Sequence, residues 1–167
     1  DASRRAVYCF DAADGKVLWR KDVPGTPEST ASVPEVMEDT GLAAPSVATD
    51  GRVVAAIFAN GDVGAFDLEG NLRWTRNLGI PKNSYGHASS LLIHRDVLLV
   101  QFDQGNVKEN LSKLFALRVT DGTTAWEVAR PVPNSWTTPT VIRAAYREQL
   151  VTAASPWVIA YDPADGT

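Results

Sequence analysis

Near its start the chain reads Val7-Tyr8-Cys9-Phe10-Asp11-Ala12-Ala13-Asp14-Gly15-Lys16-Val17-Leu18-Trp19. An apolar run, an acidic turn ending in Gly and a second run ending in Trp follow one another in this stretch. The same order returns at residues 63–74 and 114–126, and a fourth copy at residues 158–167 stops before its Trp. The turn glycines recur every 44 to 55 residues. A strand-bearing period of this length is typical of a radial or linear array of small sheets.

Each copy of the motif predicts a β-hairpin. The Asp that opens the turn can accept backbone N–H groups, and the Gly can adopt the positive φ that a short hairpin loop with a bulge requires. The third copy has Arg118 at the first turn position, so its turn must depend on Thr120 and Asp121. The positions assigned to the structural motif are Asp11, Gly15, Trp19, Asp67, Gly70, Trp74, Gly122, Trp126, Asp162 and Gly166.

The run from Asp11 to Gly15 also invites interpretation as a calcium loop. The ligand pattern is incomplete, and no Glu follows at the position that a twelve-residue loop needs. The same turn recurs in all four copies, which favours a geometric role. We therefore predict no metal site.

Each period also carries two further apolar segments, so it predicts four short antiparallel strands. These segments are residues 44–49 and 52–58, 89–94 and 97–102, and 138–143 and 149–154. Strands that are apolar on both faces, such as residues 7–10, need a sheet on each side, and the motif Trp residues can fill the wedge between sheets. The prediction is an all-β fold, a β-propeller of four-stranded antiparallel blades. No segment has a helical periodicity long enough to predict a helix.

The ends of the chain fall inside repeats, which leaves two complete blades and two partial ones. The expected divisions are residues 1–23 (end of a blade), 24–42 (long connection), 43–79 (blade), 86–130 (blade) and 136–167 (incomplete blade). A ring of seven or eight blades would need roughly 350 to 400 residues at about 50 residues per blade. We therefore expect the chain to be a piece of a larger propeller, with the remaining blades as its neighbours.

Composition excludes some classes of partner. The net charge of −4 disfavours nucleic acid, and no apolar stretch approaches the roughly 20 residues of a membrane span. The single Cys9 cannot form an internal disulfide. The segment Pro24–Gly41 is rich in Pro, Ser, Thr and acids. It is interpreted as a surface connection at one mouth of the channel, with a partner- or ligand-binding role as the alternative.

Candidate binding residues lie on the loops that lead into the innermost strands, because a rigid ring presents function on its loops. Asn83, Tyr85 and His87 precede one such strand, and Asn134 and Trp136 precede the next. His87 is either a proton carrier or ligand, or it bonds backbone groups and holds the start of the strand. Trp136 either stacks on a ligand or packs against the next blade. No catalytic residues are predicted.

The motif resembles the repeat of the pyrroloquinoline quinone (PQQ)-type propellers. Asp11–Trp19 and Asp162–Gly166 match that repeat best, and the stretches 85–90 and 98–103 are also similar to members of the group. The group includes bacterial PQQ-binding-like repeat proteins such as the outer-membrane assembly lipoprotein of the BamB type. The resemblance covers nearly the whole chain, with Pro24–Gly41 outside it.

The resemblance implies two branches of function. Non-catalytic members work as binding or scaffolding modules in the bacterial envelope, and PQQ-dependent alcohol or sugar dehydrogenases use adjacent cysteines, a calcium ion and a catalytic Asp. This chain has no Cys-Cys pair and no acidic and amide residues in a matching context. We therefore expect a non-enzymatic, extracytoplasmic module without a cofactor, which binds a protein or small ligand at the channel-mouth loops. A dehydrogenase piece with PQQ and calcium, or a sensor propeller fused to a signalling module, is the alternative.

Overall fold

The structure of the chain is a computed structural model, and it describes residues 4–31, 33–144 and 146–167. Its strands form four antiparallel sheets, numbered here as blades 1 to 4. Blade 1 contains β1 (Ala6–Phe10) and β2 (Val17–Asp22). Blade 2 contains β3 (Ala48–Thr49), β4 (Val53–Ile57), β5 (Asp62–Asp67) and β6 (Leu72–Asn77). Blade 3 contains β7 (Leu92–His94), β8 (Val97–Phe102), β9 (Lys113–Arg118) and β10 (Thr124–Ala129). Blade 4 contains β11 (Thr140–Ala144), β12 (Arg147–Ala154) and β13 (Trp157–Tyr161).

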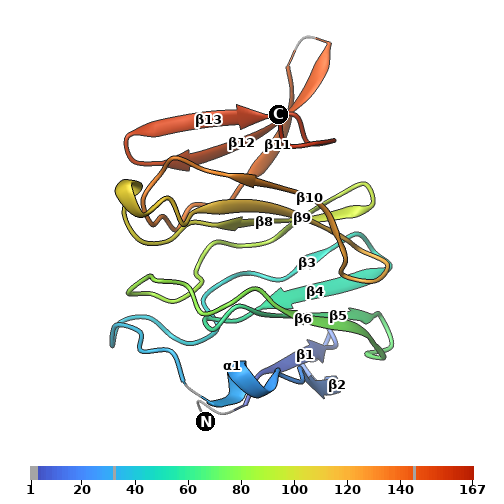
Figure 1. The fold of residues 1–167 in the computed structure, drawn as a ribbon. Coiled ribbons are helices and arrows are strands. Elements are labelled where there is room, and N and C mark those ends of the chain that lie inside the picture. The colour runs from blue at the N-terminus through green and yellow to red at the C-terminus, as the bar shows by residue number, and fades with distance from the viewer. Residues whose placement is uncertain (1–3, 32, 145) are drawn as a thin grey trace.

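The four sheets are stacked face to face in chain order, from blade 1 at the bottom of Figure 1 to blade 4 at the top. Strands follow one another across each sheet, so every sheet is a simple meander. This arrangement confirms the all-β, propeller-type fold. Within the described residues, no helix is long and apolar enough to cross a membrane.

The innermost strands are shorter than the sequence predicted. Residues 44–47 and 89–91 lie outside β3 and β7. An innermost strand has only one hydrogen-bonded neighbour, so it ends where its pairing with that neighbour ends. The expectation of no helix is also wrong in two places, α1 (Pro27–Ala31) and η1 (Val107–Glu109). Both are short pieces made by local caps rather than by periodicity. The Asn106 side chain accepts the Lys108 and Glu109 N–H groups, and Thr26 Oγ1 accepts the Ser29 N–H group.

The hairpin turns have the predicted chemistry. Asp11, Asp67 and Asp162 each accept a backbone N–H group within the turn, at 2.7 to 2.8 Å. Gly15, Gly70, Gly122 and Gly166 all have φ between 73° and 81°. The third turn relies on Asp121, which accepts the Thr123 N–H group at 2.9 Å. The hairpin registers of blades 1, 2 and 3 each shift beside the turn, as the expected bulge requires.

Each motif Trp packs on the turn of the following blade. The indole N–H groups of Trp19, Trp74 and Trp126 donate to the carbonyl oxygens of Leu68, Val119 and Pro163 at 2.9, 2.8 and 3.3 Å. The rings lie against the turn glycines: a Cβ at Gly70, Gly122 or Gly166 would stand 2.5 to 2.9 Å from the nearest indole atom. Glycine is therefore required at these positions for two reasons: its backbone adopts the positive φ, and it leaves room for the Trp ring.

Apolar cores fill the three interfaces between neighbouring blades. The largest lies between blades 2 and 3, where Phe115 and Leu117 of β9 are buried. The equivalent positions of β1 are Tyr8 and Phe10, which are 49% and 55% exposed. The prediction that β1 is buried on both faces is therefore wrong for this pair, because no sheet covers that side of blade 1 within the described residues.

Candidate functional site

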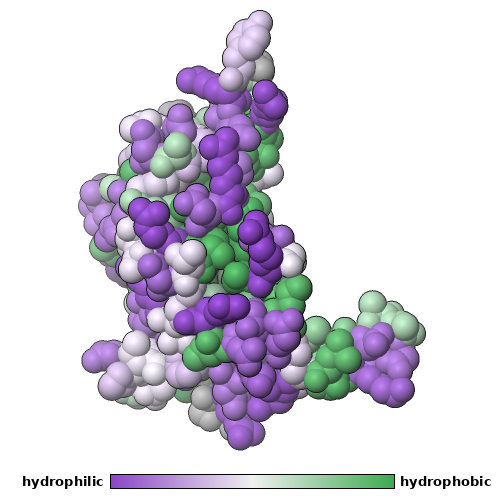
Figure 2. Space-filling view, turned by 90° about the vertical axis from the view of Figure 1, so that its right-hand side faces the viewer, coloured by the Kyte–Doolittle hydropathy of each residue, from purple (hydrophilic) through white to green (hydrophobic). Residues whose placement is uncertain are grey.

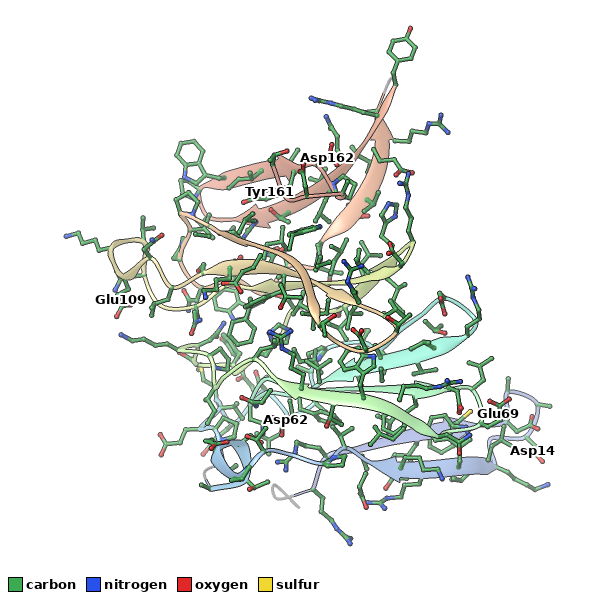
Figure 3. The ribbon with its side chains drawn as sticks, turned by 45° about the vertical axis from the view of Figure 1, so that its right-hand side comes forward. Asp14, Asp62, Glu69, Glu109, Tyr161 and Asp162 are labelled. Atoms are coloured by element: carbon green, nitrogen blue, oxygen red, sulfur yellow. The ribbon has the colours of Figure 1, made fainter. Side chains whose placement is uncertain are left out.

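The connections between strands divide the molecule into two edges. The loop edge, on the left of Figure 1, is formed by residues 23–31, 33–47, 58–61, 78–91, 103–112, 130–139 and 155–156. The opposite turn edge carries the motif turns and the turns between the first and second strands of each sheet. Figure 3 shows Glu109 at the loop edge and Asp14 and Glu69 at the turn edge. Seen from the turn edge, hydrophilic residues cover much of the surface (Figure 2).

Three of the predicted binding residues meet at the loop edge. The Trp136 indole N–H donates to Asn83 Oδ1 at 3.1 Å, and this oxygen also accepts the Tyr85 N–H at 3.0 Å. The rings of Tyr85 and Trp136 meet edge to face, with centroids 5.1 Å apart. Trp136 remains 48% exposed. The contact joins the loop before blade 3 to the loop before blade 4. Tyr85 and Trp136 together form an aromatic ridge, which Trp136 exposes to solvent.

Asn134 is the fourth predicted residue of this group. Its N–H donates to the Gly105 carbonyl oxygen at 2.9 Å, which ties its loop to the connection between β8 and β9. Two grooves meet at Asn134. A groove of about 430 Å³ has the polar residues Lys82, Ser84, Asn106 and Glu109 among its lining residues, and a second, more apolar groove of about 480 Å³ runs from Trp136 to Trp157. The ridge thus separates two surfaces of different chemistry.

His87 lies apart from the ridge. It is buried, its ring stacks on Phe102 at 5.3 Å between centroids, and its Nε2 lies 2.9 Å from the Ser89 carbonyl oxygen. Burial lowers the pKa of His87 to about 4, with a smaller opposing effect of the Ser89 hydrogen bond. The side chain is therefore neutral near pH 7. This geometry fits the role of holding the start of the strand and places no ligand-facing group at position 87.

A buried polar cluster beneath the ridge was not anticipated. The Arg130 guanidinium and the Asp103 carboxylate form an ion pair with Nε–Oδ1 at 2.7 Å, and both side chains are fully buried. Arg130 also donates to Thr152 and Tyr161 of blade 4, at 2.6 and 3.1 Å. Gln101 Nε2 reaches Asp103 and Ser135, each at 2.8 Å. This polar cluster fastens blade 3 to blade 4. The available signal was the polar pair Gln101 and Asp103 at the end of an apolar strand.

A second buried carboxylate fastens blade 1 to blade 2. Asp62 at the start of β5 accepts a hydrogen bond from Ser29 Oγ of α1 at 3.1 Å and forms an ion pair with Arg5 Nε at 2.9 Å. Figure 3 labels Asp62 near the short helix. The connection that contains α1 continues past the ridge, where the Met37 N–H donates to the Ser84 carbonyl oxygen at 2.9 Å. Ser29 and Met37 thus attach this connection to Asp62 and to the loop before blade 3.

The cysteine and acidic residues of this chain can be compared with those that PQQ-dependent dehydrogenases use. Cys9 is the only cysteine, so a disulfide of adjacent cysteines cannot form in this chain. Among residues 4–31, 33–144 and 146–167, no three His, Cys, Asp or Glu side chains gather as a metal site.

Solved structures with similar folds include both branches of the propeller group. BamB from Moraxella catarrhalis aligns with a TM-score of 0.61 and 20% identity, over 92% of this chain and 39% of that one. Quinohemoprotein alcohol dehydrogenase from Comamonas testosteroni gives 0.65 and 16%, over 97% and 31%. Quinohemoprotein alcohol dehydrogenase ADHIIG from Pseudomonas putida HK5 gives 0.53 and 20%, over 78% and 18%. The chain thus spans about two fifths or less of the length of these proteins, and the likeness shows the fold.

Sequence comparison gives the family. A search of curated proteins found no match. The family model described as outer membrane protein assembly factor BamB matches residues 2–129, which is well over half of the chain. The repeats, the stacked blades and this match agree, and the chain belongs to the family of the outer membrane protein assembly factor BamB.

Proposed function

We propose that this protein is a non-catalytic binding module of the bacterial cell envelope and that it holds a partner protein at the loop edge. The observation that carries the proposal is the aromatic ridge, in which Asn83 and Tyr85 hold Trp136 half-exposed between two grooves. A large ring fixed in position by a neighbouring blade loses little conformational entropy on binding, which suits an interface anchor. Asn134, where the grooves meet, is the adjacent polar contact.

The family supports a protein as the partner. The matched family is named for an assembly factor of the outer membrane, and one similar fold is that of BamB itself. That family name also supports an extracytoplasmic location for the present chain.

Site-specific photo-crosslinking tests the proposal. A photoreactive phenylalanine analogue at position 136 of the full-length protein, activated in intact cells, is expected to capture a discrete envelope protein. The same analogue at position 146 is the control, because Tyr146 is fully exposed in the turn between β11 and β12, on the turn edge. Equal capture at both positions, or none at position 136, would contradict the proposal.

A PQQ-dependent alcohol or sugar dehydrogenase is the second candidate, supported by the fold likeness to two quinohemoprotein dehydrogenases. PQQ would supply the oxidising group for hydride removal from an alcohol. This chain has a single cysteine, so the remaining part of the whole protein would have to provide the pair of adjacent cysteines. Tight stoichiometric PQQ in the full-length protein, together with dye-linked alcohol oxidation, would favour this candidate over the binding module.

A further inference from the structure

The groove of about 430 Å³ at the loop edge is built from the connections around blade 3. Lys82 and Ser84 come from the connection before this blade, and Asn134 comes from the connection after it. Gly105 and Glu109 lie between β8 and β9, and Figure 3 labels Glu109 at the loop edge. Blade 3 has a neighbouring blade on each side, so all walls of the groove belong to the interior of the stack.

Hydrogen bonds join these three connections. The Gly105 N–H donates to the Lys82 carbonyl oxygen at 2.8 Å, and the Asn134 N–H donates to the Gly105 carbonyl oxygen at 2.9 Å. The Lys82 N–H donates to Gln104 Oε1 at 3.0 Å. Each connection thus holds the next one, so a ligand meets walls that are already in place and orders few groups when it binds.

The charges in this groove balance. Apart from Gly105, the described residues that line it all have polar side chains, and of these only Lys82 and Glu109 are charged. The two form an ion pair, and the side-chain hydrogen bond from Lys82 holds the pKa of Glu109 below its ordinary value. An anionic ligand would have to compete with Glu109 for Lys82, and a cationic ligand with Lys82 for Glu109. A neutral ligand leaves the ion pair intact.

Two side chains in the groove have hydrogen-bonding groups to spare. The Asn134 amide and the Ser84 hydroxyl line the groove and bond to no other residue in the part of the chain that the structure describes. An amide offers N–H donors beside a carbonyl acceptor, and a hydroxyl both donates and accepts. The Lys82 ammonium also has N–H donors beyond the one that meets Glu109. This set of donors and acceptors matches hydroxyl groups on neighbouring carbon atoms, each of which donates and accepts as well.

We propose that this groove binds a neutral saccharide. Adjacent ring hydroxyls bond to the Asn134 amide, and a further hydroxyl reaches Ser84 or the remaining N–H groups of Lys82. The described lining has no apolar side chain to hold an aliphatic or aromatic ligand, and its cation is already paired, which disfavours a phosphate. The inference goes beyond the partner protein proposed for the aromatic ridge and does not use Trp136.

Isothermal titration calorimetry of the full-length protein tests the proposal. The probes are neutral trisaccharides of glucose, galactose, mannose or N-acetylglucosamine, and the charged comparisons are trisaccharides of galacturonic acid and of glucosamine. At least one neutral trisaccharide is expected to bind about fivefold more tightly than either charged one, because a charged ligand must disturb the exposed ion pair. Equal binding of neutral and charged trisaccharides, or no binding by any neutral one, overturns the proposal.

Two variants and a matched control locate the saccharide. Asn134→Ala and Ser84→Ala are each expected to weaken binding about fivefold, which corresponds to the loss of one net hydrogen bond. Asn110→Gly is the control, because it removes an amide next to Glu109 but outside the groove, and glycine adopts the left-handed φ of 51° found there. Circular dichroism checks that all three variants keep the strand content of the parent protein. Equal affinity in all three would place the saccharide elsewhere and overturn the proposal.

The two proposals for the loop edge have separate readouts. Photo-crosslinking at position 136 reports the partner protein, and calorimetry with purified protein reports the saccharide. Saccharide binding without a crosslinked protein overturns the partner protein alone, and a crosslinked protein without saccharide binding overturns the saccharide alone.

Discussion

Gly122 shows how a single position serves two blades. Its φ of 74° is costly for any residue with a Cβ, by about 1–2 kcal/mol. The Trp74 ring of the preceding blade occupies the space where a Cβ would stand, with Cε3 only 2.5 Å away. Gly15 has nearly the same φ, 73°, in the equivalent turn, but nothing lies within 4 Å of its Cβ position. An Ala substitution at Gly15 therefore carries the backbone cost alone, whereas the same substitution at Gly122 adds the cost of a steric clash with Trp74.

Gly122→Ala is expected to lower the free energy of unfolding by about 2–5 kcal/mol, the sum of the backbone cost and an overpacking cost. Gly15→Ala should lower it by about 1–2 kcal/mol, the backbone cost alone. Urea denaturation of the two variants beside the parent chain measures both. Equal losses in the two variants would show that the Trp contact adds nothing.

His87 gives a prediction for pH. Its pKa in the folded chain is about 4, below the ordinary value near 6.5, because burial disfavours the charged ring. Between about pH 6.5 and pH 4 the unfolded chain therefore binds a proton at His87 that the folded chain does not. The free energy of unfolding should therefore decrease as the pH is lowered through this window, by up to about 1.4 kcal/mol per pH unit.

Urea denaturation at pH 7 and pH 4.5 gives the free energy of unfolding lost on acidification for the parent chain and for His87→Gln. Carboxylate contacts weaken in both proteins, so the difference between the two losses reports His87. The variant should lose less stability on acidification than the parent. An unchanged pH dependence in His87→Gln would contradict the assigned burial.

At the scale of elements, β8 changes character along its length. It is apolar from Val97 to Val100 and ends in Gln101 and Phe102, and Asp103 follows directly after it. The side chains of Gln101 and Asp103 join the cluster with Arg130. The apolar part packs in the cores on either side, and the polar end fixes blade 3 to blade 4 through directional bonds. Since the ion pair is fully buried, neither partner can be compensated by water when the other is removed.

Asp103→Asn is expected to destabilise the chain by about 3–5 kcal/mol, because it leaves the Arg130 charge buried without a counter-charge. Glu127→Gln is the matched control: it breaks the partly exposed pair between Glu127 and Lys113 and should cost less than about 1 kcal/mol. Thermal unfolding monitored by circular dichroism compares the two. A small effect in Asp103→Asn would mean that solvent reaches the polar cluster.

The elements also show what the sequence could and could not predict. Period, hairpins, turn glycines and Trp positions follow from local chemistry repeated along the chain, so they were predictable. The contact of Trp136 with Asn83 joins residues on two different loops, and nothing in either loop specifies the other. The pairing of Arg130 with Asp103 is equally non-local. Polar residues at the end of an apolar strand signal that a partner exists, but the stacking of blades decides which residue it is.

For the whole molecule, the two outer sheets differ from the inner ones in what covers them. Tyr8 and Phe10 of blade 1 are half-exposed, and Ile142 and Val158 of blade 4 are also exposed. Apolar side chains on an uncovered sheet face favour association between molecules. The chain alone is therefore expected to self-associate as its concentration rises.

Sedimentation velocity over a range of concentrations measures this association. Phe10→Glu and Val158→Glu should each shift the distribution toward the monomer, whereas Tyr146→Glu, at a fully exposed turn position, should not. A monomer at all concentrations would show that the outer faces are not adhesive.

The contact between a Trp and the next turn glycine has a consequence for how such a molecule can grow. Each motif Trp contacts the turn of the following blade, and the turn glycines Gly70, Gly122 and Gly166 each lie against the Trp ring of the preceding blade. A length of one period, cut at equivalent places, therefore carries one reaching ring and one receiving turn. If it is duplicated within the gene, the new copy meets matching surfaces on both sides without any further substitution. The same two residues that bind adjacent sheets together make the number of sheets open to change by simple duplication.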